Sequence, residues 1–301
     1  MNTLQNKIDF IALISVSMAN ANGDPLNGNR PRTDYSGLGE ISDVCIKRKL
    51  RNRMQDMGYP IFVQSDERCS DGFKSLSERA AATISADTKE EYAQKACETW
   101  MDVRSFGQVF AFKAPAKGKG AKKKASAEEG DENGDASGLS VPVRGPVSIH
   151  QAVSVDPIEV RTIQITKSVN GDPTSDGSKS KDTMGMKHFV QFGLYEVKGS
   201  VNVQLAEKTG FSEEDADVLK ECLCSLFVND ASSARPDGSM VVEKVFWWKH
   251  NCKDGQYSAA KVHRSLHIAK KETVDIPSSF DDYTVTVDSL AGLEPEICDG
   301  I

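Results

Sequence analysis

The chain has 301 residues, of which 39% are hydrophobic and 27% are charged, and its formal net charge at pH 7 is −7. This composition is typical of a soluble globular protein, and no apolar run reaches the ~18 residues that a membrane span needs. The amino-terminal residues lack the basic and apolar regions of a secretory signal, and the seven cysteines show no repeated CxxC spacing. We therefore expect a cytoplasmic protein with reduced thiols that binds no membrane.

The charge is unevenly distributed along the chain. The acidic C-terminal segment, residues 275–301, contains seven acidic residues and no lysine or arginine, so residues 1–274 are formally neutral. Against this neutral background, residues 42–54 contain a single acid, Asp43, and five cations, namely Lys47, Arg48, Lys49, Arg51 and Arg53. Such a local positive field attracts the phosphate backbone of a nucleic acid.

The first predicted element is a strand at residues 7–18, with apolar residues on both faces at its start and serines on one face at its end. We expect a central strand whose end opens onto a functional surface. The loop that follows, NANGDPLNGNRPRTD at residues 20–34, contains four asparagines, two glycines and two arginines. Amide side chains and exposed glycine N–H groups bind phosphate and 2′-hydroxyl oxygens without reading bases.

A helix is predicted from its N-cap Ser42 to Met57. Ile46, Leu50 and Met54 lie on one apolar stripe, and the cations flank that stripe on both sides. The helix can therefore pack on a sheet and hold its cations at the rim. A charged helix face is usually only solvated, but the preceding amide-rich loop favours phosphate binding here.

Two further elements precede a polar segment. A helix is predicted at residues 89–100 and a strand at residues 102–112. Residues 113–138 are rich in lysine first and acids later, with almost no large apolar residue, so they are predicted to be a disordered loop. Their Gly-Lys pairs lack the spacing and context of a P-loop.

The second half of the chain supplies the remaining elements. Strands are predicted at residues 143–155, 188–203 and 240–249, a helix at 212–228, and further β structure at 261–269 and 283–287. Between the first two strands, residues 156–187 are expected to form an arm with a polar tip at residues 168–182. The order strand, helix, strand, strand, helix, strand predicts an α+β fold of the ferredoxin-like βαββαβ type, which RRM domains share. No RNP-like aromatic motif is present, so bases are not expected to stack on the sheet in the usual RRM way.

The chain contains no nucleophile elbow, HExxH motif or dinucleotide fingerprint. Zinc ligands could come from His250, Cys252, His263 and His267. However, His263 and His267 at a spacing of four converge only on a helix, and their segment alternates like a strand. We therefore expect scattered surface histidines, with no metal and no cofactor. A carboxylate-dependent nuclease could use Asp24 or Asp34, although Asp24 precedes a proline, as in an Asx-type turn.

Five motifs in order resemble a known family. They are NGDPLNGNRPRTD, GLGEISDVCIKRKLRNR, DVRSFGQVFA, VRGPVSIHQAVSVDPI and MGMKHFVQFGLYEVKGSVN. They resemble the backbone subunit of type I CRISPR surveillance complexes (Cascade), and that of the type I-C branch most closely. The match covers residues 8–203, and the C-terminal third has weaker motifs.

The resemblance implies a single domain, residues 1–301, with a modified RRM-like palm, inserted fingers at residues 59–100 and a protruding thumb arm at residues 156–187. Copies of such subunits assemble into a helical filament along one CRISPR RNA, and each thumb displaces a base. The implied partners are CRISPR RNA, the target DNA strand paired to it, other copies of the chain, and the guide-processing, large and small subunits of the complex. The implied role is RNA-guided recognition of foreign DNA in antiviral defence.

The loop chemistry and the resemblance together assign RNA binding to Asn20, Asn22, Asn27, Asn29, Arg30, Arg32, Ser42, Lys47, Arg48, Arg51, Arg144, Lys187, His188 and Phe189. The thumb residues expected to wedge between bases are Ile165, Met184 and Met186, since an apolar side chain must replace the lost stacking. Type III relatives cut RNA with a loop aspartate, and Asp34 lies near that place, but type I relatives are expected to be non-catalytic. The alternatives are a ribonuclease using Asp34 or His188, and a self-assembling structural protein without nucleic acid.

Overall fold

The computed structural model of the protein describes residues 2–111, 140–167 and 183–301. The predicted disordered loop at residues 113–138 and the predicted polar tip of the arm at residues 168–182 lie outside these ranges. None of the helices in the described ranges is both long and apolar enough to cross a membrane.

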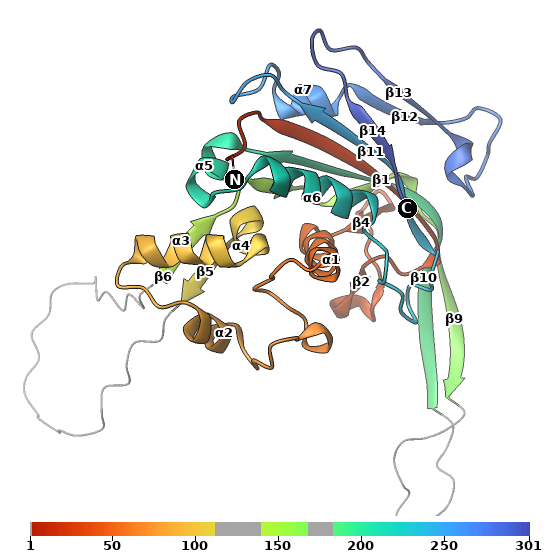
Figure 1. Ribbon diagram of the computed structural model, residues 1–301. Coiled ribbons are helices and arrows are strands. Elements are labelled where there is room, and N and C mark those ends of the chain that lie inside the picture. Colours follow the sequence, from red (N-terminus) through yellow and green to blue (C-terminus); the bar gives the residue numbers. More distant parts are fainter. Residues whose placement is uncertain (1, 112–139, 168–182) are drawn as a thin grey trace, which may run out of the picture.

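A central antiparallel sheet organises the molecule (Figure 1). Its strands lie in the order β14 (Glu296–Asp299), β11 (Met240–Lys249), β1 (Ile8–Ala19), β10 (Thr183–Val201), β8 (Ala152–Pro157) and β4 (Leu38–Ile41). Two more strands, β7 (Val147–Ile149) and β9 (Val160–Lys167), also pair with β10. The mixed α+β class predicted from the order of elements is thereby confirmed.

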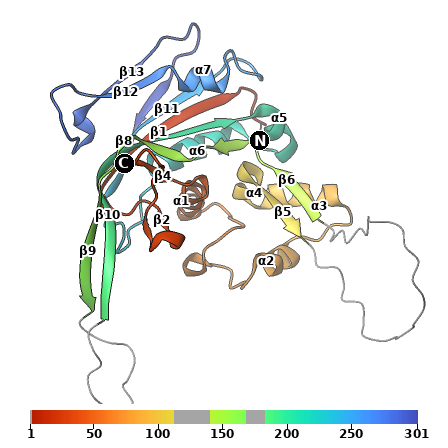
Figure 2. The ribbon, with the colours of Figure 1, turned by 180° about the vertical axis from the view of Figure 1, so that it is seen from behind.

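Both faces of the sheet are covered (Figures 1 and 2). Helices α1 (Asp43–Asp56) and α6 (Glu213–Cys224) cover one face, and α7 (Ala259–His263), β12 (Leu266–Lys270) and β13 (Tyr283–Val287) cover the other. Because side chains alternate along a strand, Phe10 and Ile14 pack in the cluster with α1 and α6, whereas Ile11 and Leu13 pack in the cluster with β12 and β13. The two-sided burial explains why the start of β1 is apolar on both faces.

A third hydrophobic cluster lies to one side of the sheet, in residues 59–111 and 140–144, for which we keep the name fingers from the sequence expectation. It contains Phe62 and Trp100, whose ring centroids are 4.7 Å apart, and extends to Phe110 and Val141, beyond residues 59–100. The elements here are a 3-10 turn at Asp66–Arg68, α2 (Leu76–Thr83), α3 (Lys89–Thr99), α4 (Met101–Phe106), β5 (Gly107–Ala111) and β6 (Ser140–Arg144). The fingers thus have a small core of their own.

The strand predicted at residues 102–112 is wrong in its first half. Residues 101–106 form α4, and only β5 is extended. Asp102 explains the difference, because its buried carboxylate accepts a hydrogen bond from the N–H of Phe62 at 2.7 Å and so holds this turn against a distant segment. The helix ends at Gly107, whose φ of +80° suits glycine.

The structure also differs from the sequence prediction at two other predicted strands, each of which is divided into separate elements. The strand expected at residues 143–155 is divided, because β6 pairs with β5 in the fingers while β7 and β8 pair with β10 in the central sheet. The β structure expected at residues 261–269 begins as α7, which Ser258 caps, and continues as β12. The sequence interpretation contained no element for β4, for α5 (Val203–Thr209) or for β14.

The acidic segment at residues 275–301 is part of the fold. It supplies a 3-10 turn at Phe280–Asp282, then β13 and the edge strand β14. Glu296 lies 2.9 Å from Lys220 and Asp299 lies 2.6 Å from Lys244, so two of its acids form ion pairs with neighbouring elements. These pairs reduce the negative charge that the segment presents to a ligand.

Candidate nucleic-acid interface

The amide-rich loop begins where β1 leaves its hydrophobic surroundings. The strand is buried through Val16, whereas Ser17 and Met18 are exposed. Met18 has a φ of 53°, a left-handed conformation that is uncommon for a residue other than glycine or asparagine. The end of β1 therefore opens onto the surface, as predicted, and the chain changes direction sharply there.

The loop itself is folded as a small hairpin. Strand β2 (Gly23–Asp24) pairs with β3 (Arg30–Pro31), and a 3-10 turn at Pro25–Asn27 joins them. Asp24 Oδ1 accepts a hydrogen bond from the N–H of Leu26 at 3.2 Å, so Asp24 makes the Asx-type turn that the sequence indicates. A turn of this kind presents its tip to solvent on a fixed backbone.

Two of the four asparagines hold the loop in place. Asn20 Nδ2 donates to the carbonyl of Asn29 at 2.7 Å, and Asn22 Oδ1 accepts from the N–H of Ser42 at 2.9 Å. Ser42 in turn caps the first turn of α1, as predicted. Asn20 is buried, whereas Asn27 and Asn29 are exposed. Asn27 and Asn29 are therefore the asparagines whose side chains are most open to a ligand.

The two arginines predicted to bind RNA from α1 are held against the fingers. Arg51 Nε donates to Asp102 Oδ2 at 2.9 Å, and Arg48 Nη1 donates to the carbonyl of Val63 at 2.6 Å. Asp102 is 1% exposed, and the Arg51 guanidinium also lies 5.1 Å from the ring centroid of Phe106. Burial, together with the neighbouring Arg51 charge, lowers the pKa of Arg48. Both side chains therefore use their charge inside the fold.

The remaining cations of α1 also have protein partners. Lys47 Nζ lies 3.0 Å from Asp43, one turn earlier in the helix, and its side chain is 24% exposed. Lys49 is buried and pairs with Asp230. Arg53 Nε donates a hydrogen bond to Ser225 Oγ at the C-terminal end of α6. The basic helix thus joins several parts of the molecule.

Arg30 connects the loop to the root of the arm. Its Nη1 donates to Thr162 Oγ1 at 2.9 Å and lies 3.4 Å from His188 Nδ1, and Thr162 Oγ1 lies 2.9 Å from the same ring nitrogen. Because Arg30 supplies the hydrogen to Thr162, the threonine hydroxyl can donate to His188 Nδ1. The structure therefore brings together two predicted RNA-binding residues from distant segments. Lys187 is half-buried and Phe189 is buried beside them.

The arm, formed by β9 and β10, is a two-stranded ribbon with two different faces. In its register Met184 and Met186 lie on the face of His188, whereas Ile165 lies on the other face, opposite Gly185. The exposed fractions of Met184, Met186 and Ile165 are 68%, 62% and 48%. The three predicted wedge residues are thus all exposed but do not form one surface.

Asp34 belongs to a turn between the loop and β4. Its Oδ1 accepts hydrogen bonds from the N–H groups of Ser36 and Leu38, each at 2.8 Å. The next residue, Tyr35, is fully exposed. The Asp34 carboxylate therefore holds the turn that presents Tyr35.

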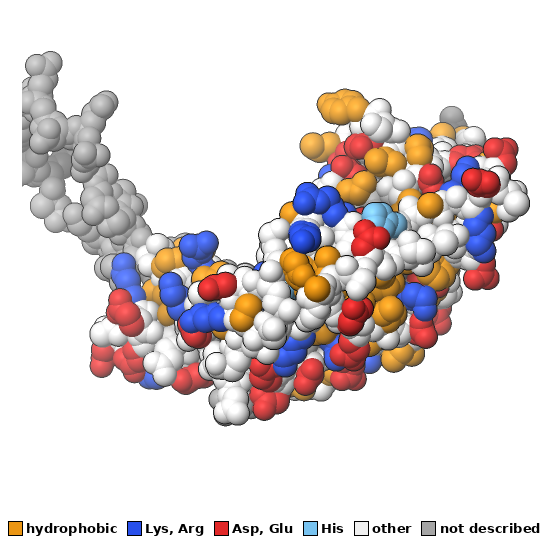
Figure 3. Space-filling view, turned by 90° about the horizontal axis from the view of Figure 1, so that it is seen from above, with side chains coloured by type: hydrophobic (Ala, Val, Ile, Leu, Met, Phe, Trp, Pro, Cys, Tyr) orange, Lys and Arg blue, Asp and Glu red, His pale blue; other side chains and the backbone are white. Residues whose placement is uncertain are grey.

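Arg144 stands apart from the other predicted residues. It lies in β6, on the fingers side of the molecule, while the arm formed by β9 and the first part of β10 lies at the opposite end (Figures 1 and 2). The face seen from above, on the side of α7, β12 and β13, shows acidic, basic and hydrophobic side chains interspersed rather than one basic patch (Figure 3). Of the predicted residues, those of the amide-rich loop and the root of the arm therefore lie together, whereas Arg144 lies elsewhere.

The four residues considered for zinc do not converge. The three histidines have separate partners: Asp9 for His250, the carbonyl of Gly199 for His263, and Asp288 for His267. His250 and His263 are buried, so the expectation of surface histidines is wrong for these two, because each ring makes a hydrogen bond inside the fold. Among residues 2–111, 140–167 and 183–301, no group of three or more such side chains could hold a metal ion.

The sequence interpretation missed the segment at residues 229–239. Its Ala234 carbonyl accepts from the N–H of Asn20 at 2.9 Å, and its Ser239 carbonyl accepts from the N–H of Ser17 at 2.8 Å. The segment therefore lies against the start of the amide-rich loop. Its composition, rich in turn-forming residues, predicts a loop but does not identify the distant strand that it contacts.

Comparison with known proteins identifies the family. The family model of CRISPR-associated protein Cas7 matches residues 6–288. CRISPR-associated protein Cas7 from Haloferax volcanii is 26% identical over 300 residues, which cover 96% of this chain and 84% of the relative. A chain of a CRISPR RNA-guided surveillance complex, pre-nicking, is similar with a TM-score of 0.45 and 17% identity, over 85% of this chain and 81% of that chain. A chain of a second CRISPR RNA-guided surveillance complex gives a TM-score of 0.42 and 16% identity, over 80% and 68% of the two chains.

The family match includes every part of the interface described above. Residues 6–288 contain the amide-rich loop, α1, the arm and the segment at residues 229–239. This protein therefore belongs to the family of CRISPR-associated protein Cas7.

Proposed function

We propose that this protein is a non-catalytic, RNA-binding subunit of a CRISPR RNA-guided surveillance complex, and that its copies line up along CRISPR RNA to form the backbone of that complex. Membership of the Cas7 family supports the proposal. The observation that carries it is the junction of Arg30, Thr162 and His188, where the amide-rich loop meets the root of the arm. One strand of RNA passing this junction would touch both segments.

The proposed grip on RNA is independent of sequence. Asn27 and Asn29 present amide groups at the tip of the loop hairpin, and Arg30 presents a cation beside them. Amides and guanidinium groups bind phosphate and ribose oxygens, which every nucleotide has. A subunit that repeats along a guide of any sequence requires this kind of contact.

We further propose that the central sheet is an RRM-like palm and that the complex is a type I-C Cascade in the cytoplasm. The strand order β11, β1, β10, β8 supports the palm, because it places the fourth strand of a βαββαβ unit beside the first and the third between the first and second. The five motifs described above support the type I-C branch. The proposed partners are CRISPR RNA, the DNA strand paired to it, further copies of this chain, and the guide-processing, large and small subunits.

The hydrogen bonds of Asp34 support a non-catalytic role. Because one carboxylate oxygen accepts from two backbone N–H groups, the side chain is held in its turn. The Asp34→Ala variant should therefore leave guide RNA and complementary RNA as intact as the wild type does, as seen on denaturing gels with added divalent metal. Periodic cuts in complementary RNA by the wild type that this change abolishes would instead show a ribonuclease.

The direct test of RNA binding is co-purification. The chain is expressed with a CRISPR array and, in parallel, without one, and the ratio of absorbance at 260 nm to that at 280 nm is measured after gel filtration. We expect a nucleic-acid ratio and a large particle only with the array. A large particle free of nucleic acid in both preparations would favour a self-assembling structural protein.

A further inference from the structure

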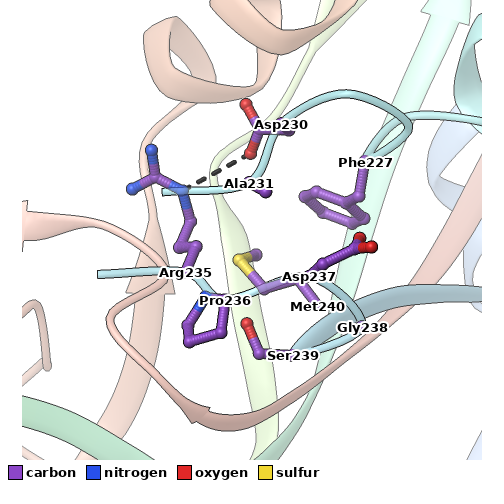
Figure 4. A pocket seen from close by; sticks show the side chains of 9 residues that line it. All are labelled: Phe227, Asp230, Ala231, Arg235, Pro236, Asp237, Gly238, Ser239 and Met240. Carbon is purple, nitrogen blue, oxygen red and sulfur yellow. Dashed lines mark ion pairs between the residues drawn. The ribbon is translucent and has the colours of Figure 1, made fainter. Parts of the chain in front are cut away.

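A cluster of cations lies where the segment at residues 229–239 meets α1 and the amide-rich loop. Arg235 lines a small hollow in this segment together with Asp230 (Figure 4). The backbone here is firmly placed, because Ser232 and Arg235 exchange two N–H to carbonyl hydrogen bonds of 2.7 and 3.1 Å. The adjacent Ala234 carbonyl binds the N–H of Asn20. Arg235 is thus fixed beside the loop that we propose to bind RNA.

Charges in this cluster do not cancel. Asp230 is shared between two cations, because it pairs with buried Lys49 and also lies 3.4 Å from Arg235 Nε. Arg32, from the end of the amide-rich loop, lies 3.6 Å from Asp24. Three cations therefore face two carboxylates. Figure 4 shows the carboxylate of Asp237, which also lines the hollow, turned toward Phe227 and away from the Arg235 guanidinium.

Both arginines have unused hydrogen-bonding groups. The Nε atoms of Arg32 and Arg235 are buried and, within the described residues, make no hydrogen bond, although Arg235 Nε lies 3.4 Å from its ion-pair partner Asp230. Their side chains are nevertheless 38% and 29% exposed, so their outer atoms reach solvent. A buried donor without an acceptor is uncommon in native proteins and calls for a specific reason. The outer Nη groups of both side chains can therefore donate hydrogen bonds to an anion that enters from solvent.

The half-buried thiol of Cys45 lies within the electrostatic reach of the same three cations. Burial raises the pKa of the Cys45 thiol, and the positive charges of Lys49, Arg235 and Arg32 all act in the opposite direction. Cys45 lies in the first turn of α1, next to the Ser42 cap that Asn22 holds. The three cations therefore all act on the first turn of α1.

We infer that Arg32 and Arg235 form a binding site for one phosphodiester group of single-stranded RNA. A phosphate suits this pair because each guanidinium presents several N–H donors in a plane, and the tetrahedral oxygens of a phosphate can accept from two such planes at once. Arg235 reaches this site from a segment more than 190 residues after the amide-rich loop. The inference rests on the proposed function for the source of the phosphate, but not for the existence of an anion site.

Salt-dependent RNA binding tests the inference. The full-length protein is titrated with a fluorescein-labelled single-stranded guide RNA at several salt concentrations, as wild type, Arg235→Gln and Arg264→Gln. Arg264 is the matched control, since it is an exposed arginine beside α7 on the other face of the sheet. Losing one phosphate contact lowers the slope of log affinity against log salt by about 0.7, and losing charged hydrogen bonds lowers affinity about tenfold. We expect both changes in Arg235→Gln and neither in Arg264→Gln.

A double variant tests whether the two arginines share one phosphate. If they do, the combined effect of Arg32→Gln and Arg235→Gln on affinity should be smaller than the product of the single effects, because the first change already weakens the contact. Effects that multiply would overturn the shared site. An Arg235→Gln protein that keeps wild-type affinity and slope would overturn the role of Arg235 in RNA binding.

A second probe separates this inference from the proposed function. If the wild type does not bind guide RNA, the proposed function fails, and the anion site is then judged with inorganic phosphate alone. Thermal unfolding is compared in phosphate and in chloride at equal ionic strength. We expect phosphate to raise the unfolding temperature of the wild type and of Arg264→Gln more than that of Arg235→Gln. An equal rise in all three proteins would reflect the general effect of phosphate on stability, and it would overturn the site.

Discussion

At the scale of single residues, buried carboxylates determine the geometry around α1. Asp102 accepts hydrogen bonds from the N–H groups of Phe62 and Val63 and from Arg51, and it is 1% exposed. A buried charge with three donors is stable, whereas one that loses its cation is strongly destabilising. Asp102 therefore joins the fingers to α1.

The Arg51→Ala variant should lower the free energy of unfolding by about 2 to 4 kcal/mol, because Asp102 would stay buried without its counter-charge. Lys47→Ala provides the comparison on the same helix. Its pair with Asp43 is partly exposed, so the expected loss is under about 0.5 kcal/mol. Urea denaturation followed by tryptophan fluorescence measures both. Equal losses in the two variants would show that the Arg51 contact adds little to the fold.

A second carboxylate makes stability depend on pH. Hydrogen bonds from Arg79, one of them 2.8 Å long, lower the pKa of Asp71 in the folded state below its usual value of 3.8. The unfolded chain then binds the proton more readily, so the pair stabilises the fold above pH 4 and loses this effect as the pH falls further. The difference in unfolding free energy between wild type and Asp71→Asn should therefore shrink below pH 4. If this difference in unfolding free energy stayed constant from pH 7 to pH 3, the proposed role of the Asp71–Arg79 pair would be wrong.

Local residue roles were predictable where both partners are close in sequence. The Ser42 cap and the Asp24 turn follow from neighbours within three residues. The partner of Asp102 is a segment some 40 positions earlier, and Ala234, next to Arg235, accepts a hydrogen bond from Asn20, more than 200 positions earlier. Neither periodicity nor turn rules predict contacts between segments so far apart in the sequence. The sequence analysis therefore assigned Arg48 and Arg51 to RNA binding, although both have partners inside the fold.

At the scale of elements, the arm shows how strand alternation divides a predicted site. Ile163 and Ile165 lie on one face of the ribbon, and Met184 and Met186 lie on the other, with His188. The sequence predicted the arm and its exposed apolar residues. It could not predict the faces, because the pairing between β9 and β10 depends on a register that only the fold determines.

The methionine face should be the one that contacts RNA, since it continues from His188 and Arg30 at the root of the arm. A Met184→Gln, Met186→Gln variant should form shorter filaments on a full-length guide RNA, as measured by negative-stain imaging. An Ile163→Thr, Ile165→Thr variant is the matched control for the other face. All four side chains are more than 40% exposed, so monomer stability should change by less than about 0.5 kcal/mol in either variant. Short filaments only in the isoleucine variant would place RNA on that face.

At the scale of the whole molecule, the long strands and helices of the central sheet were predictable from the sequence. The short strands and the points where long predicted strands divide were not. The apolar run of β1, the apolar stripe of α1 and the capped start of α6 all identify their elements. The short strands β4 and β14 were missed because four residues carry too little periodicity to distinguish them from loops. These two strands lie at the two edges of the sheet. The sequence therefore predicted the central strands of the sheet but not its edge strands.

The arm should couple copies of the protein without being needed for the fold of one copy. Residues 161–167 and 183–186, the described parts of this range, belong to none of the three hydrophobic clusters, and within the described residues the start of β10 up to Met186 pairs with β9 alone. Replacing residues 161–186 with a short Gly-Ser linker should therefore leave a soluble monomer with a near-native unfolding transition. With guide RNA, that monomer should fail to form long filaments in sedimentation and negative-stain imaging. The control places the same linker at residues 113–138, between β5 and β6, and it should assemble normally. Long filaments from the arm-replaced protein would show that assembly rests on contacts of the central sheet and fingers alone.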